Sequence, residues 1–283
     1  MDDSPVVDQL NSVIADQPVD EVLVALPIDK YGLLVETIVR RCEEQGIIVR
    51  LRSEMSNLRI ARSYVDDLEG VPIVTIQSGP QDSWQLATKR LIDIFGSVIL
   101  LVALAPLFAI VAFLIRLDSP GPVFFAQERV GLNKRRFRII KFRTMLDGSD
   151  QKQQMLEHLN EAQGPVFKIK NDPRITRLGK FLRRFSIDEL PQLINVLKGD
   201  MSLVGPRPLP VRDVERIDLH WHKRRFSIKP GITCLWQVNG RSDVRFNEWV
   251  RMDLDYIDKW SLGLDLKILM KTIPAVLRGP GAY

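Results

Sequence analysis

The chain has 283 residues, which is enough for one large domain or two smaller ones. Its 40 lysines and arginines outnumber its 35 acidic residues, so the net charge is +5 and is unevenly distributed. The two cysteines, Cys42 and Cys234, are far apart in sequence and fit neither a disulfide framework nor a C-x-x-C site. The histidines also lack the partners that a zinc site needs, so we expect surface or structural roles for His158, His220 and His222.

Residues 1–80 alternate helix and strand signals, which predicts a small parallel-sheet α/β unit. Buried strands are expected at residues 21–26, 47–51 and 71–76, with a turn at residues 66–70. Two helices are predicted from apolar stripes, the first from Val6, Val7, Leu10, Val13 and Ile14, the second from Leu34, Val35, Ile38, Val39 and Cys42. No G-x-G-x-x-G follows the first strand, so a dinucleotide site is not supported. The role of this unit stays open between regulation, formation of a homodimer and a purely structural part.

Residues 94–115 form an uncharged apolar stretch of 22 residues, long enough to cross a bilayer as one helix. Pro106, which follows Ala105 near the middle, removes a helical hydrogen bond. Basic residues flank the stretch on both sides, so a spanning helix would place one basic cluster outside. We therefore expect residues 84–118 to form a re-entrant membrane helix, broken at Ala105 and Pro106. The alternative is a buried helix of a soluble core, but such helices are rarely this long and uniformly apolar.

A basic segment follows the apolar stretch. Residues 127–145 contain seven lysines and arginines against one acidic residue, Glu128, and interleaved phenylalanines and isoleucines predict a strand or an interfacial ribbon. Nucleic acid could bind such a patch, but beside a membrane segment anionic lipid headgroups and a polyprenyl phosphate fit better. A nucleic-acid-binding protein is therefore the less favoured interpretation. Residues 262–277 are apolar enough for a final helix on or under the membrane.

Two adjacent carboxylates, Asp188 and Glu189, come after a basic run and shortly before Pro191. Proline has no N–H to donate and belongs in the first turn of a helix, which would place Asp188 near the N-cap. The apolar stripe expected behind it consists of Leu190, Leu193, Ile194 and Leu197. Free N–H groups and the helix dipole there favour an ionised carboxylate and attract phosphate groups. The alternative is a simple cap, with Ser186 and Glu189 as a capping box.

Three segments surround these carboxylates in chain order. They are residues 171–184 (N-D-P-R-I-T-R-L-G-K-F-L-R-R), residues 197–208 (L-K-G-D-M-S-L-V-G-P-R-P) and residues 229–241 (K-P-G-I-T-C-L-W-Q-V-N-G-R). Together they resemble the catalytic block of the bacterial sugar transferases, the monotopic phosphoglycosyl transferases of exopolysaccharide and O-antigen synthesis. The resemblance covers residues 89–283, and several long motifs in the same order make it specific.

The resemblance implies a reaction and a role for each site residue. The reaction is transfer of a hexose-1-phosphate from a UDP-sugar to polyprenyl (undecaprenyl) phosphate, with Asp188 as the nucleophile. Glu189 would bind Mg²⁺ or handle a proton, and both carboxylates are candidate ligands of this cofactor. Arg183 and Arg207 match phosphate-holding positions, and Arg241 is a weaker candidate for the nucleotide end.

The expected architecture is therefore α/β. A nucleotide-binding-like α/β unit (1–80) precedes the re-entrant helix (84–118) and a mostly helical α+β catalytic domain (119–283). The resemblance implies a location at the inner membrane of a bacterium, with the soluble parts on the cytoplasmic face and in contact with membrane lipids. The alternative is a catalytically silent, membrane-associated scaffold of a polysaccharide assembly complex. The intact acids and arginines at the four matching positions speak against this alternative.

Overall fold

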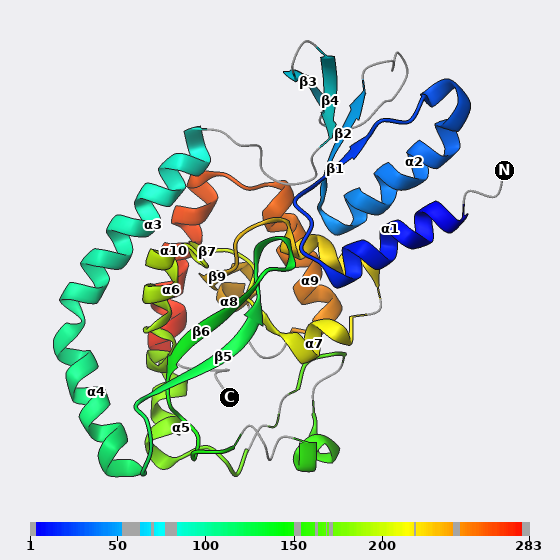
Figure 1. Ribbon diagram of the computed structural model, residues 1–283. Helices are drawn as coiled ribbons and strands as arrows, with labels where there is room; N and C mark the ends of the chain where they lie inside the picture. Colours follow the sequence, from blue (N-terminus) through cyan, green and yellow to red (C-terminus); the bar gives the residue numbers. More distant parts are fainter. Residues whose placement is uncertain are drawn as a thin grey trace.

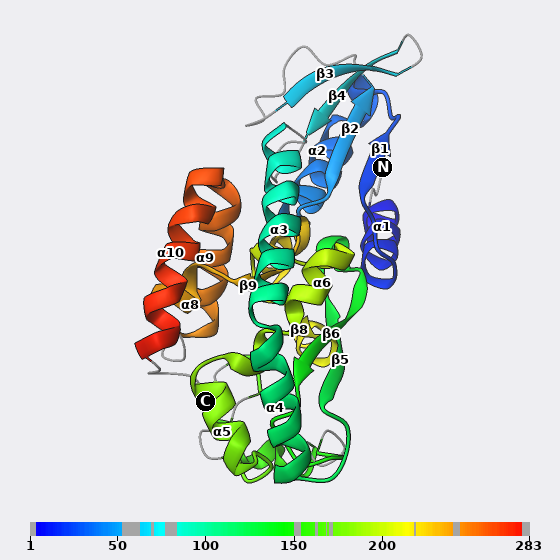
Figure 2. The same cartoon turned by 90° about the vertical axis from the view of Figure 1, so that its left-hand side faces the viewer.

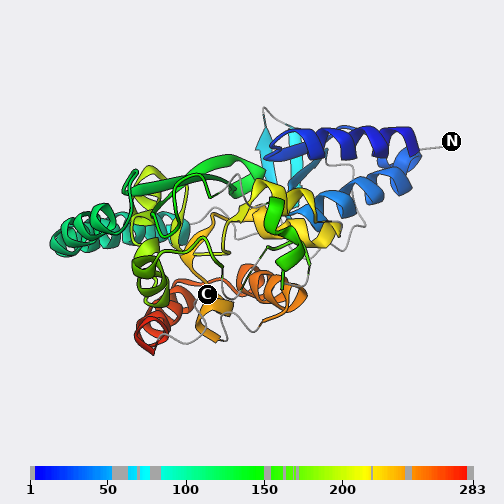
Figure 3. The same ribbon diagram turned by 90° about the horizontal axis from the view of Figure 1, so that it is seen from below.

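The computed structural model describes residues 4–52, 63–68, 71–76, 84–149, 154–161, 164–167, 169, 172–217, 219–239 and 244–278. A β-hairpin crosses the middle of the molecule (Figure 1). The helices α1 (Ser4–Asp16) and α2 (Ile28–Gln45) lie on one side of it, and the helix α4 (Ala105–Asp118) lies on the opposite side (Figures 1 and 3). The expected domain boundary near residue 80 lies outside the described residues.

The N-terminal unit is a mixed sheet packed against α1 and α2. Its strands are β1 (Glu21–Val24), β2 (Ile48–Arg52), β3 (Ser63–Leu68) and β4 (Val71–Ile76). Their order is β1-β2-β4-β3. The stripe predicted for the second helix is confirmed, because all five of its members are buried in α2: Leu34, Val35, Ile38, Val39 and Cys42. The first stripe is confirmed in part, since Ile14 is buried whereas Val6 and Val13 are exposed.

The prediction of a parallel sheet is wrong for the second half of this unit. Among the described strands of this unit, only β1 and β2 are parallel, whereas β4 runs antiparallel to both β2 and β3. Parallel neighbours need a crossover of a dozen or more residues, and only two residues separate β3 from β4. The pair therefore forms a hairpin, and Asp66 belongs to a strand rather than to the predicted turn.

The helix α3 (Trp84–Ala103) meets α4 at an angle of 61°. Leu104 separates the two helices with φ −91° and ψ 1°, and Pro106 lies in the first turn of α4, where its missing N–H costs no helical bond. The helix is thus broken as predicted, but one residue earlier than expected, since Ala105 and Pro106 both belong to α4. In the described part of the chain, no individual helix has the length and apolar character to cross a bilayer, although the bent pair meets both criteria together.

Helix α3 buries polar residues and exposes apolar ones. Lys89, Asp93 and Ser97, which are spaced four residues apart, face the rest of the protein. Lys89 Nζ donates to Asp265 Oδ2 at 2.6 Å and to the Val204 carbonyl at 3.0 Å. The exposed apolar side chains of the two helices include Phe95, Ile99, Val102, Ile110, Phe113 and Leu117. The pair is therefore not a buried helix of a soluble core. It forms an outer edge of the molecule in Figure 1 and faces the viewer in Figure 2.

The basic segment lies in a β-hairpin, which confirms the strand that its interleaved pattern predicted. The strands β5 (Phe124–Val130) and β6 (Arg136–Phe142) are antiparallel and are joined by the 3-10 turn η1 (Leu132–Lys134). The short strand β8 (Leu209–Pro210) adds to β5. A separate parallel pair consists of β7 (Ser202–Val204) and β9 (Gly231–Thr233).

The remaining helices and 3-10 turns pack around these strands. They are η2 (Gln154–Leu159), α5 (Arg177–Arg184), η3 (Ile187–Glu189), α6 (Gln192–Lys198), α7 (Val211–Glu215), η4 (His220–Ser227), α8 (Leu235–Asn239), α9 (Phe246–Asp258) and α10 (Leu262–Arg278). The helix predicted at residues 262–277 is α10, whose Ile268 enters the core, whereas Leu266, Met270, Ile273 and Leu277 are exposed. It packs against α8 and against the strands β7 and β9.

Candidate active site

Helix α5 brings Arg183 to the candidate site. The helix begins at Thr176, whose hydroxyl caps it by accepting from the Gly179 N–H at 2.9 Å. A Cβ on Gly179 would lie 2.1 Å from the Thr144 carbonyl oxygen, so glycine allows α5 to pack directly on the chain that follows β6. Arg183 Nε in turn donates to Thr144 Oγ1 at 2.9 Å, which fixes the guanidinium group beside the carboxylates.

The two carboxylates lie in η3, one turn before helix α6. Ser186 adopts the left-handed conformation, with φ 54° and ψ 23°, and makes no side-chain cap bond. The predicted capping box is therefore wrong, and Asp188 is not at the N-cap because Pro191 occupies that position. The left-handed residue turns the chain before α6 can start, and this makes Ile187–Glu189 a separate turn. The predicted stripe behind the site is also only partly right, since Leu193 is buried together with Gln192, Asn195 and Val196.

Glu189 is held by two cations. Lys141 Nζ donates to Oε1 at 2.7 Å, Arg207 Nη1 donates to Oε2 at 3.0 Å, and Arg207 Nη2 also donates to Oε1. Such charge-assisted, two-pronged contacts are strong and fix geometry. Burial alone would raise the pKa of Glu189, but the charges and hydrogen bonds of Arg207 and Lys141 hold it well below its usual range. Glu189 is therefore ionised, and both of its carboxylate oxygens accept hydrogen bonds from cations.

Asp188 is as buried as Glu189, with 7% of the residue exposed against 9%, but its carboxylate has a different environment. Within the residues described, no hydrogen bond or ion pair to its carboxylate is found. Burial raises the pKa of Asp188, and the negative charge of Glu189 adds to this. Three cations act in the opposite direction, those of Lys141, Arg183 and Arg207. The site thus combines a carboxylate that is neutralised with one that is left available to a ligand.

Arg207 is positioned by a tight crossing of two loops. A Cβ on Gly205 would lie 2.4 Å from the Lys229 carbonyl oxygen, and a Cβ on Gly231 would lie 2.0 Å from the Gly205 nitrogen. Both loops therefore need glycine for their backbones to approach this closely. Arg225 then donates from Nη2 to the Arg207 carbonyl at 2.8 Å, and it is only 1% exposed at its side chain in an ion pair with Asp253.

The structure brings together four of the five residues expected at the site: Asp188, Glu189, Arg183 and Arg207. Arg241 lies outside the described residues. The residue that the sequence did not single out is Lys141, one of seven cations in the basic segment. The position of Lys141 between Ile140 and Phe142 could have indicated this role, because a charged residue between apolar residues of a strand is typical of a paired group.

Comparison with known proteins assigns this site to a family. The sequence model of a family described as bacterial sugar transferase matches residues 84–279. The galactosyl transferase CpsE of Streptococcus agalactiae is 41% identical over 279 residues, which are 97% of this chain and 62% of that protein. The exopolysaccharide production protein ExoY of Sinorhizobium fredii is 40% identical over 202 residues, 69% of this chain and 88% of the relative.

A third relative is the UDP-glucose:undecaprenyl-phosphate glucose-1-phosphate transferase of Xanthomonas campestris. It is 35% identical over 288 residues, which are 98% of this chain and 57% of that protein. The chain thus spans less than two thirds of the length of CpsE and of the Xanthomonas transferase. The residues that form the site all lie within the part that the family model matches, and the chain belongs to the bacterial sugar transferase family.

Proposed function

We propose that this chain transfers a hexose-1-phosphate from a UDP-sugar to undecaprenyl or another polyprenyl phosphate, an early step in making an exopolysaccharide or similar glycan. The carboxylate pair is the observation that carries this proposal. Glu189 is neutralised by Lys141 and Arg207, whereas Asp188 stands beside it without a partner among the described side chains. The names of relatives support the same class of reaction, since they include undecaprenyl-phosphate transferases of glucose phosphate and of galactose phosphate.

Asp188 is the nucleophile in the reaction that we propose. One oxygen of its carboxylate attacks the β-phosphorus of the UDP-sugar, and the bond from that phosphorus to the bridging oxygen breaks. UMP leaves with the electron pair, and the sugar phosphate remains on Asp188 as an acyl phosphate. An oxygen of the polyprenyl phosphate then attacks the same phosphorus and releases the carboxylate. A carboxylate nucleophile thereby divides one displacement into two.

The cations around the pair stabilise the charge that develops on the phosphoryl oxygens. Arg183 and Arg207 carry planar donors suited to phosphate. Lys141 uses one of the three donors of its ammonium group on Glu189, so the others can reach a ligand. Glu189 holds Lys141 and Arg207 in place, and its low pKa makes it a poor source of a proton but a strong positioning group.

Magnesium is the cofactor that we propose, because it prefers oxygen ligands and often binds through one or two carboxylates plus substrate phosphates. Both oxygens of Glu189 already bind cations, so the available protein ligand is an oxygen of Asp188. No group of three metal-ligating side chains occurs among the residues described, which fits an ion completed by substrate and water. When bound, such an ion would neutralise charge on the diphosphate.

The bent helix pair is, in our proposal, the membrane anchor. Each half is roughly 17 Å long when only its uncharged residues are counted, which is too short to cross a hydrocarbon core of about 30 Å. The pair would dip into one leaflet and return, with α10 lying at the surface and the site on the cytoplasmic face. Single cysteines in place of Gln85 and Asp118, with the native cysteines replaced, should both react only from the cytoplasmic side. Labelling of either one from the other side would rule out this topology.

The covalent step can be tested without the lipid acceptor. The purified chain incubated with UDP-glucose or UDP-galactose and Mg²⁺ should release UMP up to one equivalent of enzyme. Its mass should rise by one sugar phosphate, located at Asp188. With undecaprenyl phosphate added, double-reciprocal plots should give parallel lines. Intersecting lines without any mass adduct would show direct transfer instead, with Asp188 as a metal ligand or general base.

A further inference from the structure

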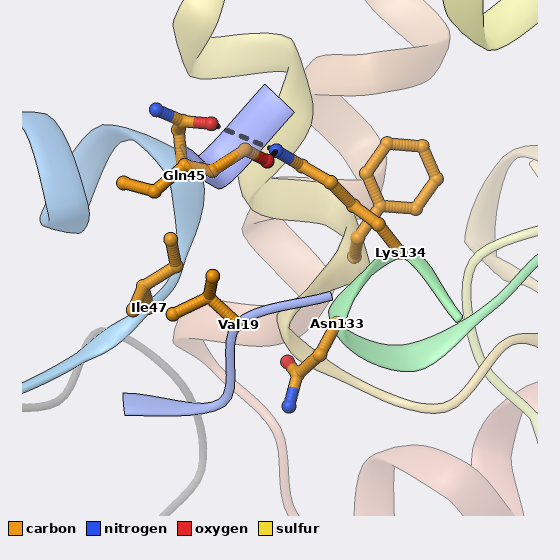
Figure 4. A pocket seen from close by; sticks show the side chains of 7 residues that line it. Val19, Gln45, Ile47, Asn133 and Lys134 are labelled. Carbon is orange, nitrogen blue, oxygen red and sulfur yellow. Dashed lines mark hydrogen bonds between the residues drawn. The ribbon is translucent and has the colours of Figure 1, made fainter. Parts of the chain in front are cut away.

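The N-terminal unit docks on the rest of the chain through the tip of the central hairpin. Lys134, the last residue of η1, donates from Nζ to the Ile14 carbonyl and to Gln45 Oε1, each at 2.9 Å (Figure 4). Its neighbours Asn133 and Arg135 both donate to the carboxylate of Asp20. The C-terminal ends of α1 and α2, together with Asp20 just before β1, therefore bind three consecutive residues at the hairpin tip.

The turn itself is of a kind that joins hairpin strands. Asn133 and Lys134 have φ angles of 48° and 61°, and a two-residue hairpin turn favours a left-handed residue at both positions. The Arg135 N–H donates to the Leu132 carbonyl at 3.0 Å and closes the turn. The Lys134 side chain is therefore not needed to close the hairpin, and it points between α1 and α2 instead (Figure 4).

A second docking contact lies on η4. Gly46, which ends α2 with φ 72°, packs so closely on this segment that a Cβ would lie 2.4 Å from the Ser227 Cβ. Phe226 of the same segment closes a small cavity against Ile14, Val19 and Ile47 (Figure 4). The N-terminal unit therefore fixes η4 as well as the hairpin tip.

Both docked segments lead to the two cations that hold Glu189. The hairpin strand β6 starts two residues after Lys134 and carries Lys141 near its other end. The segment η4 carries Arg225, whose guanidinium donates to the Arg207 carbonyl. The ladder of β5 and β6 is continuous from Val130 to Phe124, so a movement of the tip is transmitted along a paired ribbon. Asn195 accepts from the Ile140 N–H at 3.0 Å and donates to the Arg138 carbonyl at 2.7 Å, which ties the same strand to α6.

We propose that the N-terminal α/β unit positions the active site, and that Lys134 and Gly46 are the positioning residues through which it acts on Lys141 and Arg207. This inference rests on the proposed function of the site. The unit thereby contributes to catalysis. When it is docked, Lys141 and Arg207 both bind Glu189. When the docking is disturbed, their N–H donors no longer point at the phosphoryl oxygens of the substrate. Misplacement of a catalytic group by about 1 Å can lower a rate on the order of a hundredfold.

The test uses the full chain in detergent, with UDP-glucose and UDP-galactose as donors and undecaprenyl phosphate as acceptor. Lys134→Met removes both docking bonds, and Gly46→Ala forces α2 away from η4. The matched controls are Lys30→Met and Gly32→Ala in the same helix, α2, where Lys30 is exposed and a Cβ on Gly32 would meet nothing within 4 Å. Rates are measured well below the melting temperature of every variant, so that only folded protein is compared.

We expect kcat to fall by about tenfold or more in both docking variants, with KM for the donor within about twofold. Lys134→Arg keeps donors for Ile14 and Gln45 and should recover most of kcat. Both controls should match the wild type. If the docking variants lower only the melting temperature and leave kcat unchanged, the unit is a stabilising part alone and the inference is wrong. Gly46→Ala decides the question if Lys134→Met fails to fold.

A readout that needs no turnover separates this inference from the proposed function. Hydrogen–deuterium exchange should increase in β6 and around Arg207 in Lys134→Met but not in Lys30→Met. If the wild type releases no UMP, the proposed function fails, and the exchange data alone decide whether docking is coupled to the site. Unchanged exchange in both segments would overturn the coupling.

Discussion

Helices α2 and α3 show opposite arrangements of polar and apolar side chains. Helix α2 buries five apolar residues in the core of the N-terminal unit and presents charged residues to solvent. Helix α3 instead buries Lys89, Asp93 and Ser97 and leaves Ile99 65% exposed. An isolated exposed isoleucine is ordinary, but a continuous apolar face over two helices is typical of a surface that meets an apolar phase.

The same contrast extends to buried charge. In the described part of the N-terminal unit, Arg41 and Glu44 form an ion pair whose side chains are each about a third exposed, and such pairs contribute little. The part that matches the family buries Asp188 and Glu189 and pairs Glu189 with Lys141, whose side chain is 15% exposed. Buried charges are costly unless they are paired, so the unpaired Asp188 supports the ligand site that we propose. Four predictions test this contrast.

Replacing Asp188 by asparagine should have the largest effect. The amide keeps the shape but is a poor nucleophile, so turnover should fall at least on the order of a thousandfold, about 4 kcal/mol of barrier. The measurement is UMP release with lipid acceptor present. Asp8→Asn, the same change at an exposed position of α1, should leave the rate unchanged. A substantial rate in Asp188→Asn would remove the nucleophile from the proposed mechanism.

Lys89→Met should destabilise the part of the chain that matches the family. It leaves Asp265 buried opposite a methyl group, and breaking a buried pair in this way costs about 3–5 kcal/mol. Unfolding in denaturant should detect this loss, whereas Lys30→Met in α2 should change stability by less than about 0.5 kcal/mol. Equal effects of the two changes would mean that the polar face of α3 is not a packing surface.

A matched pair of isoleucines sharpens the contrast between the helices. Ile38→Ala opens a cavity in the core of the N-terminal unit and should cost about 2–5 kcal/mol. Ile99→Ala on the exposed face of α3 should change stability in detergent by less than about 0.5 kcal/mol. Ile99→Asp should instead weaken flotation of the chain with phospholipid vesicles. Vesicle binding equal to the wild type would show that this face does not enter the bilayer.

The smallest expected effect is a pH dependence at the docking turn. Burial lowers the pKa of Lys134 to about 8, and the positive charge of Lys223 adds to this. Between about pH 8 and pH 10.4 the unfolded chain keeps this proton and the folded chain has lost it, so stability should rise with pH. The neutral amine still has N–H groups for both docking bonds.

The measurement for Lys134 is the melting temperature across this window, compared with Lys134→Met, which should lack the rise. Since the side chain is partly exposed, solvent screening keeps the effect below roughly 1 kcal/mol per pH unit. The charged groups around the turn are Asp20, Arg41, Glu44, Arg135, His220 and Lys223. The pKa of His220 is lowered by burial and by Lys223, so His220 is neutral throughout the window. A curve parallel to that of Lys134→Met would contradict the prediction.

Much of the fold could be predicted because its signals are local. Apolar residues at regular spacing predicted α2, an apolar segment near the end predicted α10, and a proline in an apolar run predicted the break between α3 and α4. Strand β3 was missed because its sequence, S-Y-V-D-D-L, contains two acidic residues that are uncommon in strands. The direction of β4 depends on its pairing partner, which no local pattern specifies.

The candidate site could be predicted from its motifs but not from its geometry. Asp188, Glu189, Arg183 and Arg207 stand in recognisable segments, yet their distances depend on how β6, α5 and the Gly205 loop meet. The different states of the two carboxylates follow from Arg207 and Lys141, which reach Glu189 across 18 and 48 positions of the chain. The left-handed Ser186 gave no signal either, because serine does not favour that conformation.

The contact between Gly205 and Gly231 limits how this protein can be redesigned. Each backbone occupies the space that a side chain on the other loop would need, so even alanine at either position must push the loops apart. Arg207 follows Gly205 by two residues, and any such shift would move its guanidinium group. Donor or acceptor preference is therefore better altered in segments outside this contact. Selection schemes that randomise residues 205–207 or 229–231 should return mostly inactive clones.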